Sequence, residues 1–251
     1  SGGIVHILQD TETEETYMAE FMRGAIEASG SESRIIKGLN KGMRWDDTGA
    51  IQDAQGLAVK TVWKTWAWET AIDQMREREE EEQRLMLQGV VRTTKPQLVD
   101  VLLNSDVMVY EPLWSLIPSN KAILPVLWSL YPSNPYLLES QFELTARLKK
   151  RGYVKKPIVG RCGHNIEMVS DESRTIQKTT GQFSKQDDIY QALFKLPKID
   201  NLYTQICSFT VNGNYSGTCV RCDTSPIIQS VSDILPLRVL SDEAFAGSIS
   251  N

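Results

Sequence analysis

Residues 153–169 have the sequence Tyr153-Val-Lys-Lys-Pro-Ile-Val-Gly-Arg-Cys-Gly-His-Asn-Ile-Glu-Met-Val169. Two apolar runs flank a Gly-Arg-Cys-Gly segment, a pattern that predicts two strands joined by a tight turn. Gly160 and Gly163 permit positive φ angles and a close approach of the backbone to a ligand. Because lysines and an arginine lie beside this turn, we expect cationic side chains and backbone N–H groups to converge on an anion such as phosphate. A solvated basic turn without a ligand is the alternative.

The composition of the 251-residue chain is that of an ordinary globular protein, with 41% hydrophobic and 24% charged residues. This length allows one large domain or two smaller ones with a substantial core. The net charge of -5 gives no indication of binding to nucleic acid or to a membrane surface, and it is compatible with a cationic ligand such as a polyamine. We therefore expect neither nucleic acid nor membrane among the partners.

Hydropathy and cysteine content indicate a cytoplasmic protein. No apolar run approaches the roughly 20 residues needed to span a bilayer, and the first ten residues resemble a strand instead of a signal peptide. The cysteines at 162, 207, 219 and 222 are too few for a disulfide scaffold in a chain of this size. A reducing cytosol is accordingly the expected environment.

The N-terminal part alternates strand-like and helix-like segments. An apolar run at 3–9 precedes a helical pattern that Gly30 ends, and a further apolar run follows at 35–36. Strand, helix and strand in this order predict a parallel α/β unit. Glu14 and Glu15 fall in the first turn of the helix, where compensation of the helix dipole explains acidic residues without any ligand.

The region that follows predicts mixed local structure. Residues 43–58 are rich in Gly, Asp and Gln and predict a loop or hairpin. A strand and a helix capped by Thr65 come next, and the helix ends in a charged run at 76–84 that we expect to be solvated. The tryptophans of this region cannot share one helical face, and an aromatic core explains them better than a sugar or base platform. The apolar runs at 98–103 and 107–110 have the length of strands.

The middle of the chain predicts two further helices. Ser119 or Asn120 caps a helix with Lys121 in its first turn, where a lysine opposes the helix dipole unless both meet an anion. Pro125 is expected to strain or kink this helix. Residues 140–151 predict a second helix with basic residues near its end, which a glycine terminates.

The C-terminal part predicts a hairpin. An apolar connector at 189–197 precedes a strand at 202–211, and an Asn-Gly-Asn turn signal joins this strand to its partner at 215–223. Cys219 and Cys222 form a C-x-x-C motif, but their odd spacing places them on opposite faces of a strand. With only two histidines in the chain, a structural zinc site is disfavoured.

Known catalytic motifs add nothing to this pattern. The sequence has no internal repeat and none of the P-loop, nucleophile-elbow or zinc-protease motifs. Pattern alone therefore predicts an α/β protein with a glycine hairpin that faces phosphate.

Five blocks of the sequence are long and unusual in composition. They are Trp63-Lys-Thr-Trp-Ala-Trp-Glu-Thr-Ala71, Glu111-Pro-Leu-Trp114, Asn120-Lys-Ala-Ile-Leu-Pro125, Lys156-Pro-Ile-Val-Gly-Arg-Cys-Gly163 and Gly213-Asn-Tyr-Ser-Gly-Thr-Cys-Val-Arg221. In these blocks the chain resembles the glutathionylspermidine synthetase family, of which trypanothione synthetases are close relatives. The resemblance extends from about residue 4 to about residue 240. It implies an α/β (α+β) ATP-grasp ligase fold, with a Rossmann-like parallel lobe over residues 1–115 and an ATP-grasp nucleotide-binding and lid region over residues 116–251.

The resemblance also implies an activity. An ATP-dependent ligase of this family forms an amide bond between the glycine carboxylate of glutathione and an amine of spermidine or of glutathionylspermidine, through a glutathionyl acyl phosphate. Because a carboxylate is a poor electrophile until it is phosphorylated, this chemistry needs cations at the transferred phosphoryl group and the exclusion of water. ATP and Mg²⁺ are the implied cofactors. The acidic run at 76–84 and the residues after 240 favour the trypanothione-forming members.

Functional residues can be transferred where the sequence matches the family. ATP binding is implied for Lys121, Lys156, Cys162, Gly163, Gln191, Leu193, Phe194, Gln205, Pro226, Ile227 and Ile228. Arg221 resembles the mobile arginine that closes over the reacting phosphate and is the implied catalytic residue. Polyamine contacts are implied for Glu14 and Asp233, and glutathione contacts for Glu15 and Thr70. Family members commonly have Trp at the position of Phe194, which keeps an aromatic contact.

Two parts of the family pattern are missing from this sequence. The magnesium ligands of the family, together with a glutathione-binding arginine, lie upstream of the first residue, and so does its N-terminal cysteine amidase domain. We therefore expect the chain to be the C-terminal part of a bifunctional synthetase/amidase, to contain no metal ligand, and to be inactive in ligation as an isolated fragment. A non-catalytic module of the same fold that binds nucleotide or a thiol peptide is the alternative. A structural or zinc-binding module built on the cysteines is a third hypothesis.

Overall fold

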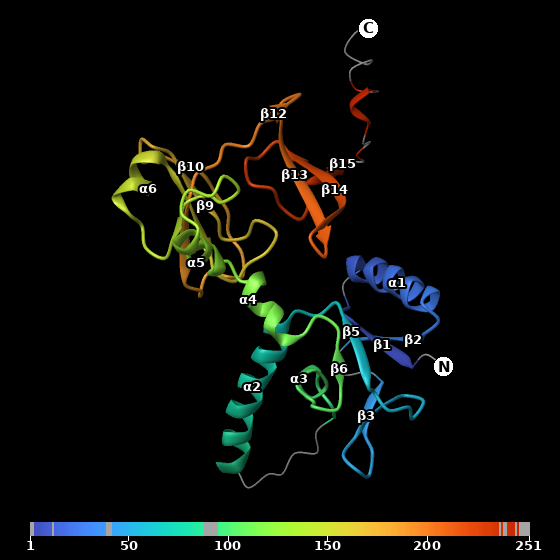
Figure 1. Cartoon of the computed structure of the whole chain (residues 1–251). Helices are drawn as coiled ribbons and strands as arrows, with labels where there is room; N and C mark the ends of the chain where they lie inside the picture. Colours follow the sequence, from blue (N-terminus) through green and yellow to red (C-terminus); the bar gives the residue numbers. More distant parts are fainter. Residues whose placement is uncertain are drawn as a thin grey trace. The chain divides into compact units, whose positions relative to one another are not determined.

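The computed structural model describes residues 3–11, 13–38, 42–87, 95–235, 237, 240–243 and 245. The chain forms two compact units, Ser1–Leu116 and Ile117–Asn251, and each is described by itself (Figure 1). Among the described residues, no helix has both the length and the apolar character needed to cross a membrane.

The first unit is built on a four-stranded parallel sheet in the order β2-β1-β5-β6 (Figure 1). Its strands are β1 (Ile4–Gln9), β2 (Glu32–Lys37), β5 (Thr61–Lys64) and β6 (Met108–Val109). Helix α1 (Thr13–Ala28) connects β1 to β2, and helix α2 (Trp68–Leu87) follows β5. The predicted parallel α/β unit is confirmed.

The order of the strands creates a switch point. The chain leaves β1 towards β2 on one side, and β5 pairs with β1 on the other side. Helices α1 and α2 therefore both begin at the carboxyl edge of the sheet, where ligands bind in open α/β folds. Strand β1 is apolar almost throughout because it is buried on both faces, with Ile7 and His6 fully inaccessible. Gly30, with a φ of +85°, ends the helical segment and lets β2 begin.

The core of the first unit contains Trp68, which packs with Leu8, Val62 and Leu98. Its indole Nε1 donates to the carbonyl oxygen of Glu111 at 2.9 Å, so the polar atom of the buried ring is satisfied. The expected aromatic core is thereby confirmed at this tryptophan.

Two local predictions in this unit have different outcomes. The hairpin predicted within residues 43–58 is present as β3 (Met43–Trp45) and β4 (Ile51–Asp53). The strand predicted at 98–103 is wrong, because Leu98–Leu102 forms helix α3. Its four buried apolar residues recur at helical spacing, and the Asp100 carboxylate caps the helix by accepting from the backbone N–H of Gln97 at 2.8 Å.

Three short helical segments follow β6: the 3₁₀ turn η1 (Leu113–Ser115), α4 (Leu116–Ser119) and α5 (Ile123–Leu130). The side chain of Asn120 accepts from the backbone N–H of Ala122 at 2.8 Å, and Lys121 precedes α5 instead of lying in its first turn. The predicted kink at Pro125 is wrong. Proline occupies the first turn of α5, where its missing N–H removes no intrahelical bond.

The second unit contains a five-stranded antiparallel sheet in the order β10-β9-β8-β11-β7. Its strands are β7 (Ser140–Gln141), β8 (Tyr153–Pro157), β9 (Glu167–Val169), β10 (Thr175–Lys178) and β11 (Asp188–Ala192). The two strands predicted within 153–169 are β8 and β9, which pair from Tyr153 opposite Val169 to Lys155 opposite Glu167. The connecting loop 158–166 is longer than the tight turn that the sequence predicts.

Two further predictions in the second unit are wrong. The apolar connector expected at 189–197 begins with strand β11, which lies between β8 and β7. The helix expected over 140–151 is restricted to α6 (Ala146–Arg151), because Thr145 caps it by accepting from the N–H of Leu148 at 3.2 Å. The residues before this cap are left free to form β7.

A second sheet of this unit has the order β12-β13-β14-β15 and is antiparallel throughout. Its strands are β12 (Lys198–Ile199), β13 (Leu202–Val211), β14 (Asn214–Asp223) and β15 (Asp233–Leu235). The predicted turn is confirmed at Asn212 and Gly213, which have φ angles of +50° and +76°. Cys219 and Cys222 point to opposite faces as expected, since they lie opposite Cys207 and Thr204.

Candidate functional site

The second unit brings Lys156, Gln191 and Ser140 into one hydrogen-bonded row. Nζ of Lys156 donates to Oε1 of Gln191 at 2.6 Å, and Nε2 of Gln191 donates to Oγ of Ser140 at 3.0 Å. Ser140 is fully buried, and its hydroxyl donates in turn to the carbonyl oxygen of Leu138 at 3.0 Å. The direction of each donor therefore fixes the amide of Gln191 with its oxygen towards the lysine.

Strand pairing accounts for this row. Gln191 lies directly opposite Ser140 on β7, and Lys156 lies opposite Ile189, two residues before Gln191. Side chains two residues apart on a strand share a face, so the three polar groups meet on one face of the sheet. The neighbouring Lys155 points to the other face, where its Nζ pairs with the Asp188 carboxylate at 2.8 Å.

The Lys156 ammonium is held in an unusual electrostatic environment. Burial, together with a smaller effect of the positive charge of Lys121, lowers the pKa of Lys156 to about 8. The hydrogen-bond partner of Lys156 is a neutral amide oxygen and not a carboxylate. A buried ammonium that donates to a neutral amide and is affected by the charge of a second lysine fits a negatively charged ligand.

Lys121 anchors the loop that joins β8 to β9. Its Nζ donates to the carbonyl oxygen of Gly160 at 2.5 Å, and its backbone N–H donates to that of Ile158 at 2.9 Å. A Cβ atom at Gly160 would lie 3.0 Å from Cγ of Pro157 and 3.6 Å from Nζ of Lys121. The glycine thus allows the loop backbone to approach the lysine closely.

Gly163 packs the same loop against the segment at 226–228. A Cβ atom at Gly163 would lie 2.6 Å from the carbonyl oxygen of Ile228 and 2.9 Å from Cγ2 of Ile227, and its φ is +70°. Thr179 supports the loop because its hydroxyl contacts the carbonyl oxygen of Gly163 at 2.5 Å and accepts from the N–H of Ile166 at 3.0 Å. The fold therefore brings together two regions that the sequence analysis assigned to ATP binding.

The remaining residues predicted to bind the nucleotide differ in exposure. Leu193 packs against the small core formed by Val154, Met168 and Ile227. The Phe194 ring is 56% exposed, Cys162 is exposed with a φ of +51°, and Pro226 is half-buried. Phe194 therefore has an aromatic face accessible to a ligand.

Arg221 and Gln205 lie directly opposite each other on β14 and β13. One terminal nitrogen of the Arg221 guanidinium donates to the carbonyl oxygen of Gln229 at 2.6 Å. Among the described residues, none accepts a hydrogen bond from the buried Nε of Arg221. A buried N–H donor without an acceptor is costly, so this nitrogen fits a site that an acceptor of a ligand completes.

The predicted substrate contacts are divided between the units. Glu15 and Thr70 lie in the first turns of α1 and α2, which both begin at the carboxyl edge of the parallel sheet. At this edge the Thr65 hydroxyl accepts from the N–H of Asp10 at 2.9 Å and so ties the ends of β1 and β5 together. Glu14 also belongs to α1, but its side chain lies outside the described part of the structure.

Asp233, the second predicted polyamine contact, belongs to the other unit. It lies exposed on β15, opposite Cys222. Its carboxylate is thus accessible to a cationic ligand.

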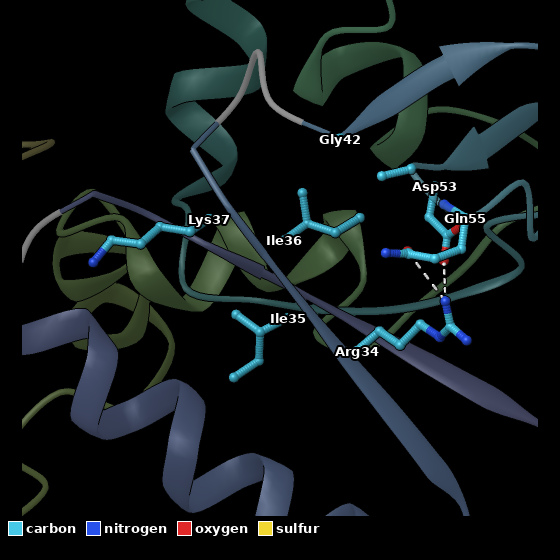
Figure 2. A pocket seen from close by; sticks show the side chains of 8 residues that line it. Arg34, Ile35, Ile36, Lys37, Gly42, Asp53 and Gln55 are labelled. Atoms are coloured by element: carbon cyan, nitrogen blue, oxygen red, sulfur yellow. Dashed lines mark hydrogen bonds and ion pairs between the residues drawn. The ribbon is translucent and has the colours of Figure 1, made fainter.

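A separate hollow of about 200 Å³ lies in the first unit, between β2 and the β3–β4 hairpin (Figure 2). Nη1 of Arg34 reaches Oδ2 of Asp53 and Oε1 of Gln55, both at 3.1 Å, as Figure 2 shows. Asp53 also contacts Nε2 of the buried His6 at 3.3 Å, and burial lowers the pKa of this histidine. The hollow is not lined by any residue predicted from the sequence, and two of its charged groups, Arg34 and Asp53, form an ion pair with each other. We interpret this cluster as structural.

The structure adds residues that the sequence analysis missed. Ser140 orients Gln191, and the carbonyl oxygen of Gln229 holds Arg221. Neither residue belongs to a motif. Strand pairing reveals Ser140, and the hydrogen bond from Arg221 to the loop before β15 reveals Gln229. Within the described residues, no group of three or more His, Cys, Asp or Glu side chains gathers that could hold a metal ion.

Comparisons with known proteins identify a family that matches almost the whole chain. The family model described as "Glutathionylspermidine synthase preATP-grasp" matches residues 2–240. The bifunctional glutathionylspermidine synthetase/amidase of Escherichia coli (strain K12) is 50% identical over 240 residues, which cover 94% of this chain and 38% of that protein. The trypanothione synthetase of Crithidia fasciculata is 36% identical over 239 residues, which cover 94% of this chain and 36% of that protein.

The chain thus spans less than two fifths of the length of these relatives. Among solved structures, the D-cycloserine synthetase DcsG matches with a TM-score of 0.48 at 14% identity, over 98% of this chain and 78% of that chain. The ATP-grasp ligase PsnB complexed with a minimal precursor, Mg and ADP matches with a TM-score of 0.45 at 14% identity, over 98% and 79%.

Proposed function

Because the chain belongs to the glutathionylspermidine synthase preATP-grasp family, we propose that it binds nucleotide and substrates in an ATP-dependent ligase that joins glutathione to a polyamine. The new bond is an amide between the glycine carboxylate of glutathione and an amine of the polyamine. The run at 76–84 and the residues after 240 suggest the trypanothione-forming members, but the greater identity to the E. coli synthetase/amidase than to the trypanothione synthetase favours spermidine as the acceptor. The four free cysteines support a reducing, cytoplasmic environment.

One observation carries this proposal: Lys156, whose pKa is lowered to about 8, donates to a neutral amide and lies near a second lysine. Burial and the charge of Lys121 disfavour the ammonium form of Lys156, whereas a nearby anion favours it. A nucleotide phosphate placed between Lys156 and Lys121 would relieve the repulsion. The bound anion would also raise the pKa of Lys156 and so keep the ammonium form populated above pH 8.

ATP supplies the phosphoryl group that turns the glutathione carboxylate into a reactive electrophile. In this proposal Lys121 and Lys156 balance the negative charge of the phosphates. Arg221, whose buried Nε lacks an acceptor among the described residues, donates to the phosphoryl oxygens. The loop at Cys162 and Gly163 covers the phosphates and excludes water, which would otherwise hydrolyse the activated carboxylate.

The nucleotide base would occupy the apolar surface near β11. Leu193 and Phe194 supply an aliphatic and an aromatic face, and Gln205 and the segment 226–228 border the same region in our assignment. The exposed ring of Phe194 is suited to stacking on adenine.

The substrates would be held by groups of opposite charge and by hydrogen bonds. In our proposal Glu14 and Asp233 bind the ammonium groups of the polyamine, and Glu15 and Thr70 bind glutathione. The first lobe, residues 1–115, thus contributes substrate contacts, and residues 116–251 contribute the nucleotide site and lid. The described residues gather no group of three or more His, Cys, Asp or Glu side chains, so we assign no magnesium ligand to them. We also propose that an amidase accompanies this ligase, since the name of the E. coli relative joins the two activities.

ATP binding to the 251-residue chain tests the nucleotide assignment. Isothermal titration would compare the unmodified chain with Lys156→Met and with the matched control Lys155→Met, which removes the adjacent lysine on the opposite face. We expect Lys156→Met to weaken binding by about tenfold or more, the loss of one charge-assisted hydrogen bond or more. Lys155→Met should bind ATP as the unmodified chain does. Absence of ATP binding in the unmodified chain, or equal affinities in all three, would overturn the assignment.

The ligase reaction is tested in the longer parent protein with glutathione and spermidine. ADP release should require both substrates, and mass spectrometry of the product should show one glutathione attached through an amide. Release of ADP that does not depend on the polyamine would contradict the proposed reaction.

A further inference from the structure

Two cysteines face each other across the β13–β14 hairpin. Cys207 and Cys219 are directly opposed in the strand register, and both are free thiols with partial exposure. Burial raises the pKa of the Cys207 thiol, and the Cys219 thiol raises it further through a hydrogen bond and its charge. The register therefore places the two thiols beside each other on one face of the hairpin.

The backbone geometry of this pair permits a disulfide. Directly opposed residues of antiparallel strands have Cα atoms about 4.5 or 5.5 Å apart. Both distances lie within the range of about 4.4–6.8 Å that disulfides accept. Cys207 and Cys219 can thus be joined without a change in the pairing of their strands.

The pair lies next to the candidate catalytic arginine. Gln205 and Arg221 form the opposed pair two residues further along the same strands, so the four side chains share one face of the hairpin. Although the pKa of the Cys207 thiol is raised by burial, the charge of Arg221 acts on it in the opposite direction, as expected for neighbours on one face. The other cysteine of β14, Cys222, is buried on the opposite face of the hairpin. Its Sγ lies 3.8 Å from Oγ1 of Thr204, the residue opposite it on β13.

We propose that Cys207 and Cys219 are a redox-modification site, at which a small-molecule disulfide converts the two thiols into a cross-strand disulfide that restrains Arg221. The expected effect of the disulfide on nucleotide binding rests on the proposed function, because the proposed function assigns Arg221 to the phosphates. The formation of the disulfide rests on the strand register alone.

The oxidation follows ordinary thiol–disulfide exchange. The thiolate of one cysteine attacks a sulfur of the small disulfide, forming a mixed disulfide and releasing one small thiolate, which takes up a proton. The thiolate of the second cysteine then attacks the protein sulfur of this mixed disulfide. The cross-strand bond forms and the second small thiolate leaves and is protonated. Two protein thiols are oxidised, and one small disulfide is reduced to two thiols.

Glutathione disulfide is the probe of this chemistry, since it is the oxidised form of the proposed substrate. The disulfide would hold β13 and β14 together beside Arg221 and oppose the movement that brings the guanidinium from Gln229 towards a ligand. Strained or exposed disulfides are the ones that thiols reduce readily. The modification is therefore expected to be reversible by reduced glutathione or dithiothreitol.

The test incubates the 251-residue chain with mixtures of reduced and oxidised glutathione, followed by thiol counting, intact-mass measurement and peptide mapping. The unmodified chain should lose two thiols and the mass of two hydrogen atoms, with Cys207 linked to Cys219. Cys207→Ser should not form this link and should acquire glutathione at Cys219. Cys162→Ser, which removes the exposed cysteine of the other sheet's loop, should still form the link. Failure of the unmodified chain to form the Cys207–Cys219 link in any mixture would overturn the redox site.

ATP titration of the reduced and oxidised forms tests the effect on Arg221. Oxidation should weaken ATP binding several-fold in the unmodified chain and in Cys162→Ser, and dithiothreitol should restore it. A Cys207→Ser/Cys219→Ser variant should bind ATP equally well under both conditions. Linked protein that binds ATP as the reduced form does would overturn the restraint of Arg221. If the reduced chain itself does not bind ATP, the proposed function fails, whereas the thiol count still decides whether the redox site exists.

Discussion

Lys156 donates from Nζ to Oε1 of Gln191 across 2.6 Å, so a cation on β8 is matched with a neutral oxygen on β11. The amide cannot turn its nitrogen towards the lysine without losing the hydrogen bond from Nε2 to Ser140. The lysine is thereby oriented without being neutralised. Its charge stays available to a ligand that a carboxylate partner would exclude.

A carboxylate at position 191 should therefore compete with the nucleotide. Gln191→Glu has nearly the same shape, but it would form an ion pair with Lys156 and raise the pKa of the ammonium. Because hydrogen bonds to charged groups contribute about 1.5–3 kcal/mol, we expect ATP to bind about tenfold to a hundredfold more weakly. Isothermal titration measures the change, and Gln177→Glu on β10 controls for an added charge in the same sheet. An unchanged ATP affinity of Gln191→Glu would show that a counter-charge beside Lys156 does not compete with the nucleotide.

Lys156→Met should make the protein more stable while it weakens ATP binding. The pKa of Lys156 is about 8 in the folded chain against 10.5 as its ordinary value, so at neutral pH the folded state holds the charge at a cost of at most about 3 kcal/mol. Both states are neutral above pH 10.5, and the stabilisation by Met should therefore shrink as the pH rises from about 8 to 10.5. Urea unfolding at several pH values measures this dependence.

The control for this experiment has the opposite sign. Lys155→Met removes the ion pair with Asp188, which raises the pKa of Lys155. Its stabilising contribution is present below the ordinary lysine pKa and is lost as the pH rises through the raised value. Lys155→Met should thus lower stability at neutral pH, and a stabilising effect of both variants would contradict our account of the two lysines.

Ser140→Ala should weaken both the fold and the nucleotide site. The substitution leaves Nε2 of the buried Gln191 without its acceptor, which costs about 1–3 kcal/mol of unfolding free energy. The freed amide can then rotate, and ATP should bind several-fold more weakly. Thermal unfolding and ATP titration measure the two effects. The control is Ser129→Ala, which removes an exposed hydroxyl that donates to the carbonyl oxygen of Val126 and should change neither stability nor ATP affinity. Equal effects of the two variants would show that Ser140 does not orient Gln191 for the nucleotide.

Gly163→Ala should displace the loop from the segment at 226–228. The φ of +70° is unfavourable for alanine, at a cost of about 1–3 kcal/mol, and the added methyl group would lie 2.6 Å from the backbone oxygen of Ile228. We expect a lower melting temperature and weaker ATP binding. Gly217→Ala on β14 is the matched control, because a Cβ atom there has no neighbour within 4 Å among the described residues. A melting temperature unaffected by Gly163→Ala would contradict the close packing of this loop.

Elements with strong local signals could be predicted from the sequence. The parallel α/β unit follows from two apolar strands around an amphipathic helix, and the β13–β14 hairpin follows from Asn212 and Gly213. These signals depend on residues that are near each other in the chain, so the folded context does not alter them.

Two short apolar runs, at 98–103 and 189–197, were assigned to the wrong kind of element. Leu98–Leu102 forms a helix although its length suits a strand, because the Asp100 cap and the helical spacing of its buried residues decide between the two. Strand β11 was missed because its alternation of buried and half-buried residues includes polar side chains, and only pairing with β8 on one side and β7 on the other stabilises it.

The candidate site was only partly accessible to sequence reasoning. The family resemblance selects Lys121, Lys156 and Gln191, and the structure brings the first two near each other and hydrogen-bonds the last two. Ser140 could not be predicted, since the segment resembles the start of a helix and its partner is 51 residues away in sequence. The assignments of these residues to a nucleotide stay predictions until binding is measured.

The alternation of β8 has one more consequence. Lys155 and Lys156 are chemically identical neighbours, and only the odd or even position of each along the strand decides which of them meets Gln191 and which meets Asp188. Deleting one residue upstream within the strand would exchange the two lysines without changing the composition of the sheet. Which lysine meets Gln191 therefore depends on its position along the strand, counted from Gly152. A deletion or insertion of one residue in β8 would alter the site as much as a substitution.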